Sequence, residues 1–353
     1  MATPLRLGIL GTGNIARQFA AGLASSARTV VQAVASRRLD TAGAFAEAHR
    51  IPTPYGSYDQ LLRDRSLDAV YVSLPNSMHR EWTVAALRAG KHVLCEKPIA
   101  ANAAEAEEMF DAARRAGKVL VEAFMYRSHP LTHAVMETVR GGEIGQVKLV
   151  RTSFCFRTTR VEGNIRFDPS LAGGALMDIG CYCLNFSRLV AGAEPVAAHA
   201  VGVLHAGGVD ESAAGVLSFP GGVTGSFTCG MTVQADNSAY VCGTEGYVEI
   251  PVPWKPSAQS AEYRVVRGTP PKMDGPARGL AQPPAKQART IDAGKELYAL
   301  EADDFGAAVQ EGAPPRVGRD DSVGNMRLLD SLRRQVGVAF SDSVGQADLR
   351  SSR

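Results

Sequence analysis

Short apolar runs alternate with amphipathic stretches over the first 122 residues. The apolar runs span residues 5–10, 30–36, 69–74, 92–95 and 119–122, with helical periodicity between them at 15–24, 77–89 and 103–116. Continuous apolar runs of this length are typical of strands buried on both faces. Parallel strands need a crossover of a dozen or more residues, which the helical stretches provide. The pattern predicts a doubly wound parallel sheet.

The rhythm changes after about residue 125. A helical pattern at 129–140 precedes a β-rich run at 147–156, a polar loop with several arginines and a helical stretch at about 174–190. Short β runs then follow closely, at 196–204, 213–219, 223–231, 239–242, 247–250 and 263–266. Turns as short as Pro220-Gly221-Gly222 between such runs predict a large, mostly antiparallel open sheet. The fold class is therefore α/β followed by α+β.

The chain length of 353 residues indicates two domains, which we place at 1–123 and 124–353. Residues 268–290 carry five prolines and several basic residues with little apolar pattern, so an exposed, mobile loop is expected there. Helical patterns at 296–309 and 320–336 should pack back on the body. Cap candidates for the second pattern are Asp320, Asp321 and Ser322.

Composition narrows the classes of function. With 38 basic and 36 acidic residues the net charge is +2, which favours neither nucleic acid nor an anionic membrane. The six cysteines lack metal-ligand spacing, so we expect buried, reduced thiols and no metal site. No apolar run approaches the roughly 20 residues of a membrane span, and the first strand leaves no room for a signal sequence. A cytoplasmic protein acting on small molecules is predicted.

A glycine turn follows the first strand directly and opens the first helix. Its residues are Gly11, Thr12, Gly13, Asn14, Ile15 and Ala16. Gly11 permits the tight turn, Gly13 lets the backbone approach a pyrophosphate, and Ala16 permits close helix packing. Because the helix N-terminus faces the phosphates, this context predicts dinucleotide binding.

The end of the second strand indicates which dinucleotide. Ser36, Arg37 and Arg38 stand where an acid would bind the ribose hydroxyls of NAD. Guanidinium groups bind phosphate in a bidentate manner, so NADP is preferred and NAD remains possible. The alternative is that both arginines are simply solvated.

Two further strand ends carry polar residues that should face the same cleft. Ser73, Pro75 and Asn76 end the third strand and His79 enters the next helix, where Asn76 either lines the cofactor cleft or only caps the helix. Glu96 and Lys97 end the fourth strand. Because open α/β sheets bind ligands at the carboxyl ends of their strands, Lys97 should face the cofactor.

A second constellation lies at Gly173-Gly174-Ala-Leu-Met-Asp178-Ile-Gly-Cys-Tyr182. If this stretch is helical from Gly174, Asp178 and Tyr182 share one face and could address one substrate hydroxyl. A phenol acts as a base only if its pKa falls below about 10, and a nearby ammonium such as Lys97 would lower it. A purely structural role for the pair is the alternative.

Together, Gly11-x-Gly13-x-x-Ala16, Glu96-Lys97-Pro98 and Gly174-x-x-x-Asp178-Ile-Gly-x-Tyr182 resemble the Gfo/Idh/MocA oxidoreductases, which join a Rossmann domain to an α+β domain with a large open sheet. Stretches at 95–98, 173–183, 225–229 and 243–246 look most like the branch of dihydrodiol and NADP-dependent D-xylose dehydrogenases, and 124–130 is also similar to glucose–fructose oxidoreductase.

The resemblance implies roles for particular residues. In that branch the corresponding lysine, aspartate and tyrosine surround the substrate carbon next to the nicotinamide, which makes Lys97, Asp178 and Tyr182 the catalytic candidates. Tyr182 would donate or accept the proton, Lys97 would lower its pKa, and Asp178 would orient substrate or lysine. Arg127 and Arg157 are looser substrate-side candidates.

The expected function is an NADP-dependent dehydrogenase that moves hydride between the nicotinamide and a hydroxyl-bearing carbon of a sugar, polyol or trans-dihydrodiol. A redox-neutral enzyme with a tightly retained cofactor is one alternative. A dinucleotide sensor without turnover is another, although a sensor needs no proton-transfer group. The apolar strands between 196 and 266 exceed what two closing helices can cover, so a homodimer or higher homo-oligomer through the open sheet is expected.

Overall fold

The computed structural model describes residues 3–268 and 285–339. Its first sheet has six parallel strands in the order β3-β2-β1-β4-β5-β6. They are β1 (Leu5–Leu10), β2 (Thr29–Ala35), β3 (Thr53–Tyr55), β4 (Ala69–Val72), β5 (His92–Glu96) and β6 (Leu120–Ala123). The crossovers are α1 (Asn14–Gly22), α2 (Leu39–His49), α3 (Tyr58–Leu62), α4 (His79–Arg88) and α5 (Ala103–Ala116). The predicted doubly wound parallel sheet is confirmed.

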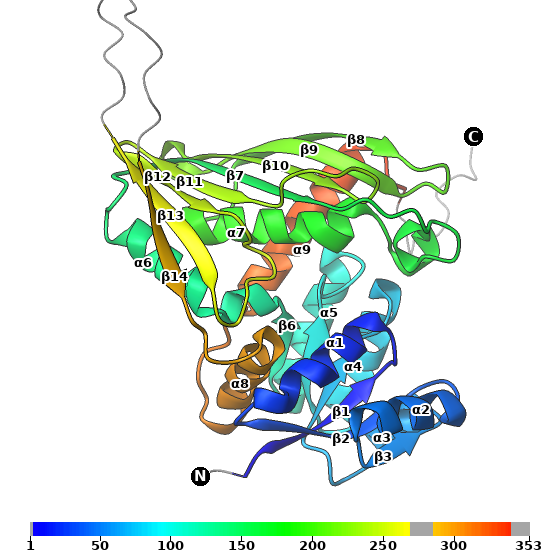
Figure 1. The fold of residues 1–353 in the computed structure, drawn as a ribbon. Coiled ribbons are helices and arrows are strands. Elements are labelled where there is room, and N and C mark those ends of the chain that lie inside the picture. The colour runs from blue at the N-terminus through cyan, green and yellow to red at the C-terminus, as the bar shows by residue number, and fades with distance from the viewer. Residues whose placement is uncertain (1–2, 269–284, 340–353) are drawn as a thin grey trace, which may run out of the picture.

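A second sheet of eight strands faces the first across the molecule (Figure 1), in the order β14-β13-β12-β11-β7-β10-β9-β8. Its strands are β7 (Val147–Cys155), β8 (Ala197–Leu204), β9 (Asp210–Ser218), β10 (Thr224–Gly230), β11 (Ala239–Gly243), β12 (Gly246–Ile250), β13 (Ala261–Arg267) and β14 (Lys286–Ile291). All neighbours are antiparallel except β7 and β10, which pair in parallel. The prediction of a large, mostly antiparallel sheet is confirmed.

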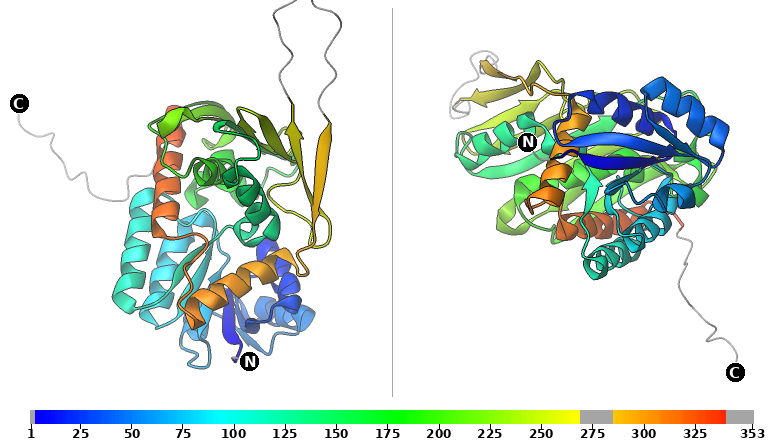
Figure 2. Two further views of the ribbon diagram at one scale, coloured as in Figure 1. Left: turned by 90° about the vertical axis from the view of Figure 1, so that its left-hand side faces the viewer. Right: turned by 90° about the horizontal axis from the view of Figure 1, so that it is seen from below.

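Helices fill the space between the sheets and leave one face open. Below the second sheet lie α6 (Pro130–Arg140), α7 (Cys181–Ala191) and α9 (Arg319–Gln335), and α8 (Leu297–Gln310) packs on α1 (Figure 1). Figure 2 shows α9 beside α5. The closing helices therefore pack back, as expected, on residues 3–123, which we call the first half; the described residues from 124 on are the second half. In the described part of the chain no helix covers the opposite face, where Val201 and Val216 are 76% and 56% exposed.

The structure corrects three local expectations. Strand β3 has only three residues, too few for a hydrophobic pattern, and was not predicted. Strand β14 lies in the segment expected to be a loop. Its polar sequence does not indicate a strand, and it is the antiparallel pairing with β13 that makes it one. Residues 269–284 of that segment lie outside the described residues. Helix α9 has Gly318 as its N-cap without a side-chain cap bond, while the Asp321 carboxylate accepts hydrogen bonds from Arg127 and Arg188 instead.

Two further expectations concern chemistry. All six cysteines are free and five of them are buried, as predicted. Among residues 3–268 and 285–339 no helix has the length and hydrophobicity to cross a membrane, and no cluster of three or more candidate metal ligands occurs.

Candidate active site

A cavity of about 780 Å³ lies at the carboxyl ends of β1, β4 and β5, where the first sheet faces the second. The structure brings most of the predicted site residues to its wall. They are Gly11, Thr12, Gly13, Asn14, Ile15, Ser36, Arg37, Ser73, Pro75, Asn76, Glu96, Lys97, Asp178 and Tyr182. The lining also includes residues that the sequence did not single out as site residues, among them Gln18, Tyr58, Phe154, Arg166 and Lys255.

The glycine turn forms one end of the cavity from backbone alone. Gly11 has φ +105°, and a Cβ there would lie 3.0 Å from the carbonyl oxygen of Ser73, so only glycine fits without strain. A Cβ on Gly13 would meet nothing within 4 Å and would occupy open cavity. Helix α1 starts at this point without a side-chain cap, so its first amides are available to an anion. These features fit a dinucleotide pyrophosphate.

The two arginines after β2 separate in space. Arg37 lines the cavity with Ser36, and no hydrogen bond engages its guanidinium among the described residues. The guanidinium of Arg38 instead binds the carboxylate of Asp40, with Nε donating at 3.0 Å, and both side chains are exposed. Of these two arginines, only Arg37 is therefore free to meet a phosphate in the cavity.

The residues after β4 have different surroundings. Asn76 lines the cavity, and its side-chain amide donates to the carbonyl oxygen of Ala172 at 2.9 Å, so it ties the two halves together and does not cap a helix. His79 is fully buried outside the lining, with Nδ1 2.9 Å from the Pro98 oxygen and Nε2 2.8 Å from the Leu74 oxygen. Because both ring nitrogens contact backbone oxygens, we assign His79 a role in holding two backbone turns. Burial lowers its pKa.

Lys97 leaves the end of β5 and reaches across the cavity to the second half. Its Nζ donates to the backbone oxygen of Asp178 at 2.6 Å and lies 3.3 Å from carboxylate Oδ1. Burial disfavours the ammonium and is the largest single effect, but the negative groups around it, Asp178 first and then Cys181 and Glu96, together outweigh it and raise the pKa of Lys97. The neighbouring Glu96 is buried, its Oε2 accepts from the Lys97 amide at 3.2 Å, and burial raises its pKa.

Asp178 joins two cations. Its Oδ2 accepts a hydrogen bond of 2.6 Å from Nε of Arg166, on the side opposite Lys97. Burial alone would raise the pKa of this carboxyl, but Lys97 and Arg166 together lower it, so Asp178 is ionised. Arg166 lies in the arginine-containing loop. Arg157 of the same loop, the predicted substrate-side candidate, is exposed, lies outside the lining and pairs with Thr232 in a β-bridge.

The backbone under Asp178 is not the regular helix that the sequence suggested. Residues Leu176–Gly180 form a π-helical turn, and α7 starts only at Cys181. Asp210 Oδ2 accepts from the Leu176 amide at 2.6 Å, and a Cβ on Gly174, which has φ +119°, would lie 2.2 Å from Asp210 Oδ1. The glycine is therefore needed for close contact with Asp210.

Tyr182 lies deeper than expected. It is 3% exposed, its ring packs edge-on against Phe124 and Phe154, and its hydroxyl donates to Sδ of Met125 at 3.3 Å. The ammonium of Lys97 lies over the ring, 4.9 Å from its centre. Burial raises the pKa of Tyr182 well above its usual value. The expected fall of this pKa is therefore wrong as a net result, because burial, with smaller contributions from nearby negative groups, raises it.

Arg127 is also engaged away from the cavity. Its guanidinium donates to Asp321 at 2.6 Å, to Asn185 at 3.0 Å and to the backbone oxygen of Arg316 at 2.9 Å. It does not line the cavity, so it braces the start of α9 against the rest of the second half.

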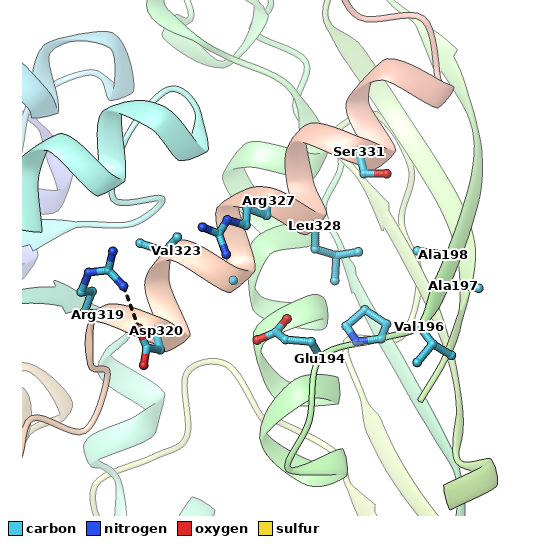
Figure 3. Close-up of a pocket in the computed structure, with 12 residues that line it drawn as sticks. Glu194, Val196, Ala197, Ala198, Arg319, Asp320, Val323, Arg327, Leu328 and Ser331 are labelled. Atoms are coloured by element: carbon cyan, nitrogen blue, oxygen red, sulfur yellow. Dashed lines mark hydrogen bonds and ion pairs between the residues drawn. The ribbon is translucent and has the colours of Figure 1, made fainter. Parts of the chain in front are cut away.

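A second hollow, of about 470 Å³, lies between α9 and residues 194–198 (Figure 3). Its charged side chains are paired: Arg319 with Asp320, Arg327 with Glu107, and Glu194 with Arg188. Without free groups that converge on one point, this hollow is a poor candidate for catalysis.

Known families and proteins resemble most of the chain. Residues 5–124 match the oxidoreductase family with an NAD-binding Rossmann fold, and residues 132–249 match the GFO/IDH/MocA C-terminal domain. Trans-1,2-dihydrobenzene-1,2-diol dehydrogenase of Mus musculus is 36% identical over 95% of this chain and 98% of its own. D-xylose 1-dehydrogenase (NADP(+)) 2 of Haloferax volcanii is 37% identical over 93% and 96%.

Solved structures agree with these matches. A 3-ketoreductase from Actinomadura kijaniata, in complex with NADP and TDP-benzene, superposes with a TM-score of 0.83 at 32% identity, covering 94% of this chain and 98% of its own. An aldose-aldose oxidoreductase from Caulobacter crescentus, complexed with glycerol, gives 0.84 at 31% identity, with 95% and 98% covered. The chain therefore belongs to the Gfo/Idh/MocA family of oxidoreductases, as its sequence motifs indicated.

Proposed function

We propose that this protein is an NADP-dependent dehydrogenase acting on a hydroxyl-bearing carbon of a sugar, polyol or trans-dihydrodiol. The observation that carries the proposal is the convergence of Lys97, Asp178 and Tyr182 in the same cavity as the glycine turn. The dihydrodiol and NADP-dependent xylose dehydrogenases, which are similar over nearly the whole chain, support the same activity.

Residues of the first half would hold the cofactor. The backbone of Gly11, Gly13 and the start of α1 suits the pyrophosphate, and Arg37 suits a 2′-phosphate. Glu96 and Lys97, at the end of β5, would border the nicotinamide, and Pro75 and Asn76 would border the groove between the two ends. When bound, NADP supplies the nicotinamide that takes or gives the hydride.

Three side chains would support proton transfer at the reacting oxygen: Lys97, Asp178 and Tyr182. The ammonium of Lys97 donates a hydrogen bond to the reacting oxygen and stabilises its negative charge. In oxidation, the hydroxyl proton would leave through Tyr182, whose phenolate accepts it beside the Lys97 ammonium, while Asp178 stays ionised and holds that ammonium. In carbonyl reduction, the protonated phenol of Tyr182 is the donor, after its hydroxyl leaves Met125.

A panel of sugars, polyols and dihydrodiols scored by NADPH absorbance at about 340 nm tests the proposal. We expect at least one member to reduce NADP, and the same member to give little product with NAD. Absence of NADPH formation across the panel, by a protein that binds NADP, would count against a dehydrogenase and in favour of a sensor.

The likeness to an aldose-aldose oxidoreductase favours a second candidate, a redox-neutral enzyme that keeps its cofactor bound. Absorbance of the desalted protein separates the two. A retained cofactor survives desalting and is reduced by one sugar and reoxidised by another without free NADP, whereas an exchanging dehydrogenase emerges without it.

We further propose that the protein is a homo-oligomer, most simply a dimer, which uses the open face of the second sheet. Exposed valines on β8 and β9 support this, because apolar patches of this kind usually mark interfaces. Light scattering should give a mass near twice 37.4 kDa or above. A cytoplasmic location is proposed from the six unpaired thiols, which suit a reducing compartment, and cell fractionation tests it.

A further inference from the structure

Lys255 is an ammonium built into the wall of the cavity from the second half. Its neighbours Trp254 and Pro256 are buried, and Trp254 stacks on Phe154 while its Nε1 donates to the Ser153 oxygen at 2.8 Å. This anchoring fixes the backbone that presents Lys255 to the cavity. The side chain reaches α1 of the first half, where Nζ donates to Oε1 of Gln18 at 3.3 Å.

The ammonium of Lys255 has no carboxylate partner within ion-pair distance among the described residues. Its hydrogen bond to Gln18 is to a neutral group. Burial lowers the pKa of Lys255, and the nearby charge of Lys97 lowers it further. Lys255 is exposed in the open cavity, but a cofactor and a substrate would cover it, and an unpaired charge is costly once it is desolvated.

Arg166 offers a second unused donor set on the same wall. Its Nε is taken by Asp178, but neither terminal nitrogen makes a hydrogen bond with a described residue. The side chain is 42% exposed, and its Cζ lies 5.8 Å from the centre of the Phe156 ring, which supports the plane of the guanidinium. Guanidinium nitrogens that point into a cavity suit a carboxylate or a phosphate.

The charges at this end of the cavity do not balance. Three cations, Lys97, Arg166 and Lys255, share the wall with only two carboxyl groups, Asp178 and Glu96, so one positive charge remains even with both carboxyls ionised. The oxidised nicotinamide ring would add a further positive charge. A neutral sugar leaves this excess uncompensated.

We propose that the physiological substrate carries an anionic group, a carboxylate or a phosphate ester, which Lys255 and Arg166 bind while Lys97 contacts the reacting hydroxyl. The proposal rests on the proposed dehydrogenase function and names its substrate class. The cofactor's own phosphates are a poorer match for Lys255, because the first amides of α1 and Arg37 would already meet them. The charged groups that act on Lys255 are those of the reacting end, Lys97, Glu96, Asp178 and Arg166.

Calorimetry of the full-length protein saturated with NADPH tests this without requiring turnover. The titrants are matched sets of a neutral aldose, its uronate and its phosphate ester, for example D-glucose, D-glucuronate and D-glucose 6-phosphate, with the xylose and galactose counterparts. We expect one anionic member to bind at least about tenfold more tightly than its neutral parent, and the comparison of uronate with phosphate identifies which anion is used.

Variants of Lys255 make the test specific. Lys255→Met should remove about ten- to a hundredfold of the anion's affinity, change that of the neutral parent by less than about threefold, and leave NADPH binding unaltered. Lys255→Arg should restore most of the affinity. Lys148→Met, which removes an exposed lysine of β7, is the matched control and should change nothing.

Distinct results overturn distinct claims. If every neutral sugar binds as tightly as its anionic partners, the substrate class is wrong and the dehydrogenase proposal stands. If Lys255→Met weakens NADPH as much as it weakens the anion, Lys255 serves the cofactor, and the proposal is again wrong. If the protein does not bind NADPH at all, the proposed function fails together with this inference.

Discussion

The two ends of the cavity are built in different ways. The end at the glycine turn is made mainly of backbone, with Gly11 at positive φ, Gly13 facing open space and the uncapped start of α1, and the side chain of Arg37 stands beside it. The end at Lys97 is made of side chains from separate segments, with Asp178 and Arg166 supplied by the second half. Backbone recognition accepts any molecule with the same phosphates, whereas the side-chain end can be altered one residue at a time. Cofactor class and substrate choice can therefore change independently.

The largest effects are expected at the side-chain end. Lys97→Met and Tyr182→Phe should each lower kcat by about a hundred- to ten-thousandfold, since proton transfer contributes that much, with NADP affinity within about threefold of the parent. The double variant should be far less than additively worse if both groups serve one proton transfer.

Thermal unfolding supplies the control for Tyr182→Phe. The hydroxyl donates only to the Met125 sulfur among described residues, so its removal should change the free energy of unfolding by less than about 1 kcal/mol. Near-parent turnover by a well-folded Tyr182→Phe would make this tyrosine structural and leave the proton to Lys97 and Asp178.

The backbone end should show a smaller effect that depends on the cofactor. Arg37→Ala should weaken NADP about ten- to a hundredfold and leave NAD unchanged, because it removes a charge-assisted contact to the 2′-phosphate. Arg38→Ala is the matched control: its guanidinium is already paired with Asp40, so NADP affinity should stay within about threefold. Equal losses in fluorescence titrations of both variants would show that the two arginines act together.

Asp178 links the two halves electrostatically, so its removal should move a pKa. Its carboxylate raises the pKa of Lys97 against the effect of burial. In Asp178→Asn, burial is opposed less strongly, so the pKa of Lys97 should fall. The alkaline limb of the kcat/KM profile, where Lys97 loses its proton, should then move to lower pH. An unmoved limb would assign that ionisation to another group.

The smallest effect concerns Glu122, a buried carboxyl that forms no ion pair with a described residue. Glu122 is 1% exposed and its Oε2 has no hydrogen-bond partner among the described residues, so burial raises its pKa from 4.5 to about 8. The folded state holds the proton of Glu122 more tightly than the unfolded state does. The contribution of this carboxyl to the free energy of unfolding is therefore fully present below about pH 4.5 and is progressively lost as pH rises toward 8.

Glu122→Gln should abolish that loss. The amide oxygen can still accept from the Ile99 amide, as Oε1 does now at 2.8 Å. At pH 8 the variant should be more stable than the parent by about 1 kcal/mol or more, or roughly 2–4 °C in Tm. Glu137→Gln, an exposed change on α6, should leave the Tm difference between pH 5 and pH 8 as in the parent. If Tm falls equally between pH 5 and pH 8 in the parent, Glu122→Gln and Glu137→Gln, then Glu122 is not the cause of the fall.

The sequence by itself determined the features that depend on neighbours along the chain. The strand periodicity, the glycine turn at Gly11 and the position of Lys97 at the end of β5 are local, because side-chain alternation and backbone freedom act over a few residues. Sequence alone therefore predicted the two sheets, the family and most of the cavity wall.

Only the tertiary structure decided which groups are free. It paired Arg38 with Asp40 and Arg127 with Asp321. It also placed Arg166 beside Asp178. Lys255 and Lys97, which are 158 positions apart along the chain, line the same cavity. The tertiary structure also buried Tyr182 against Met125 and so raised the pKa that the sequence argument had lowered. Ionisation and pairing depend on distance in space and on exclusion of water, and neither quantity can be read from spacing along the chain.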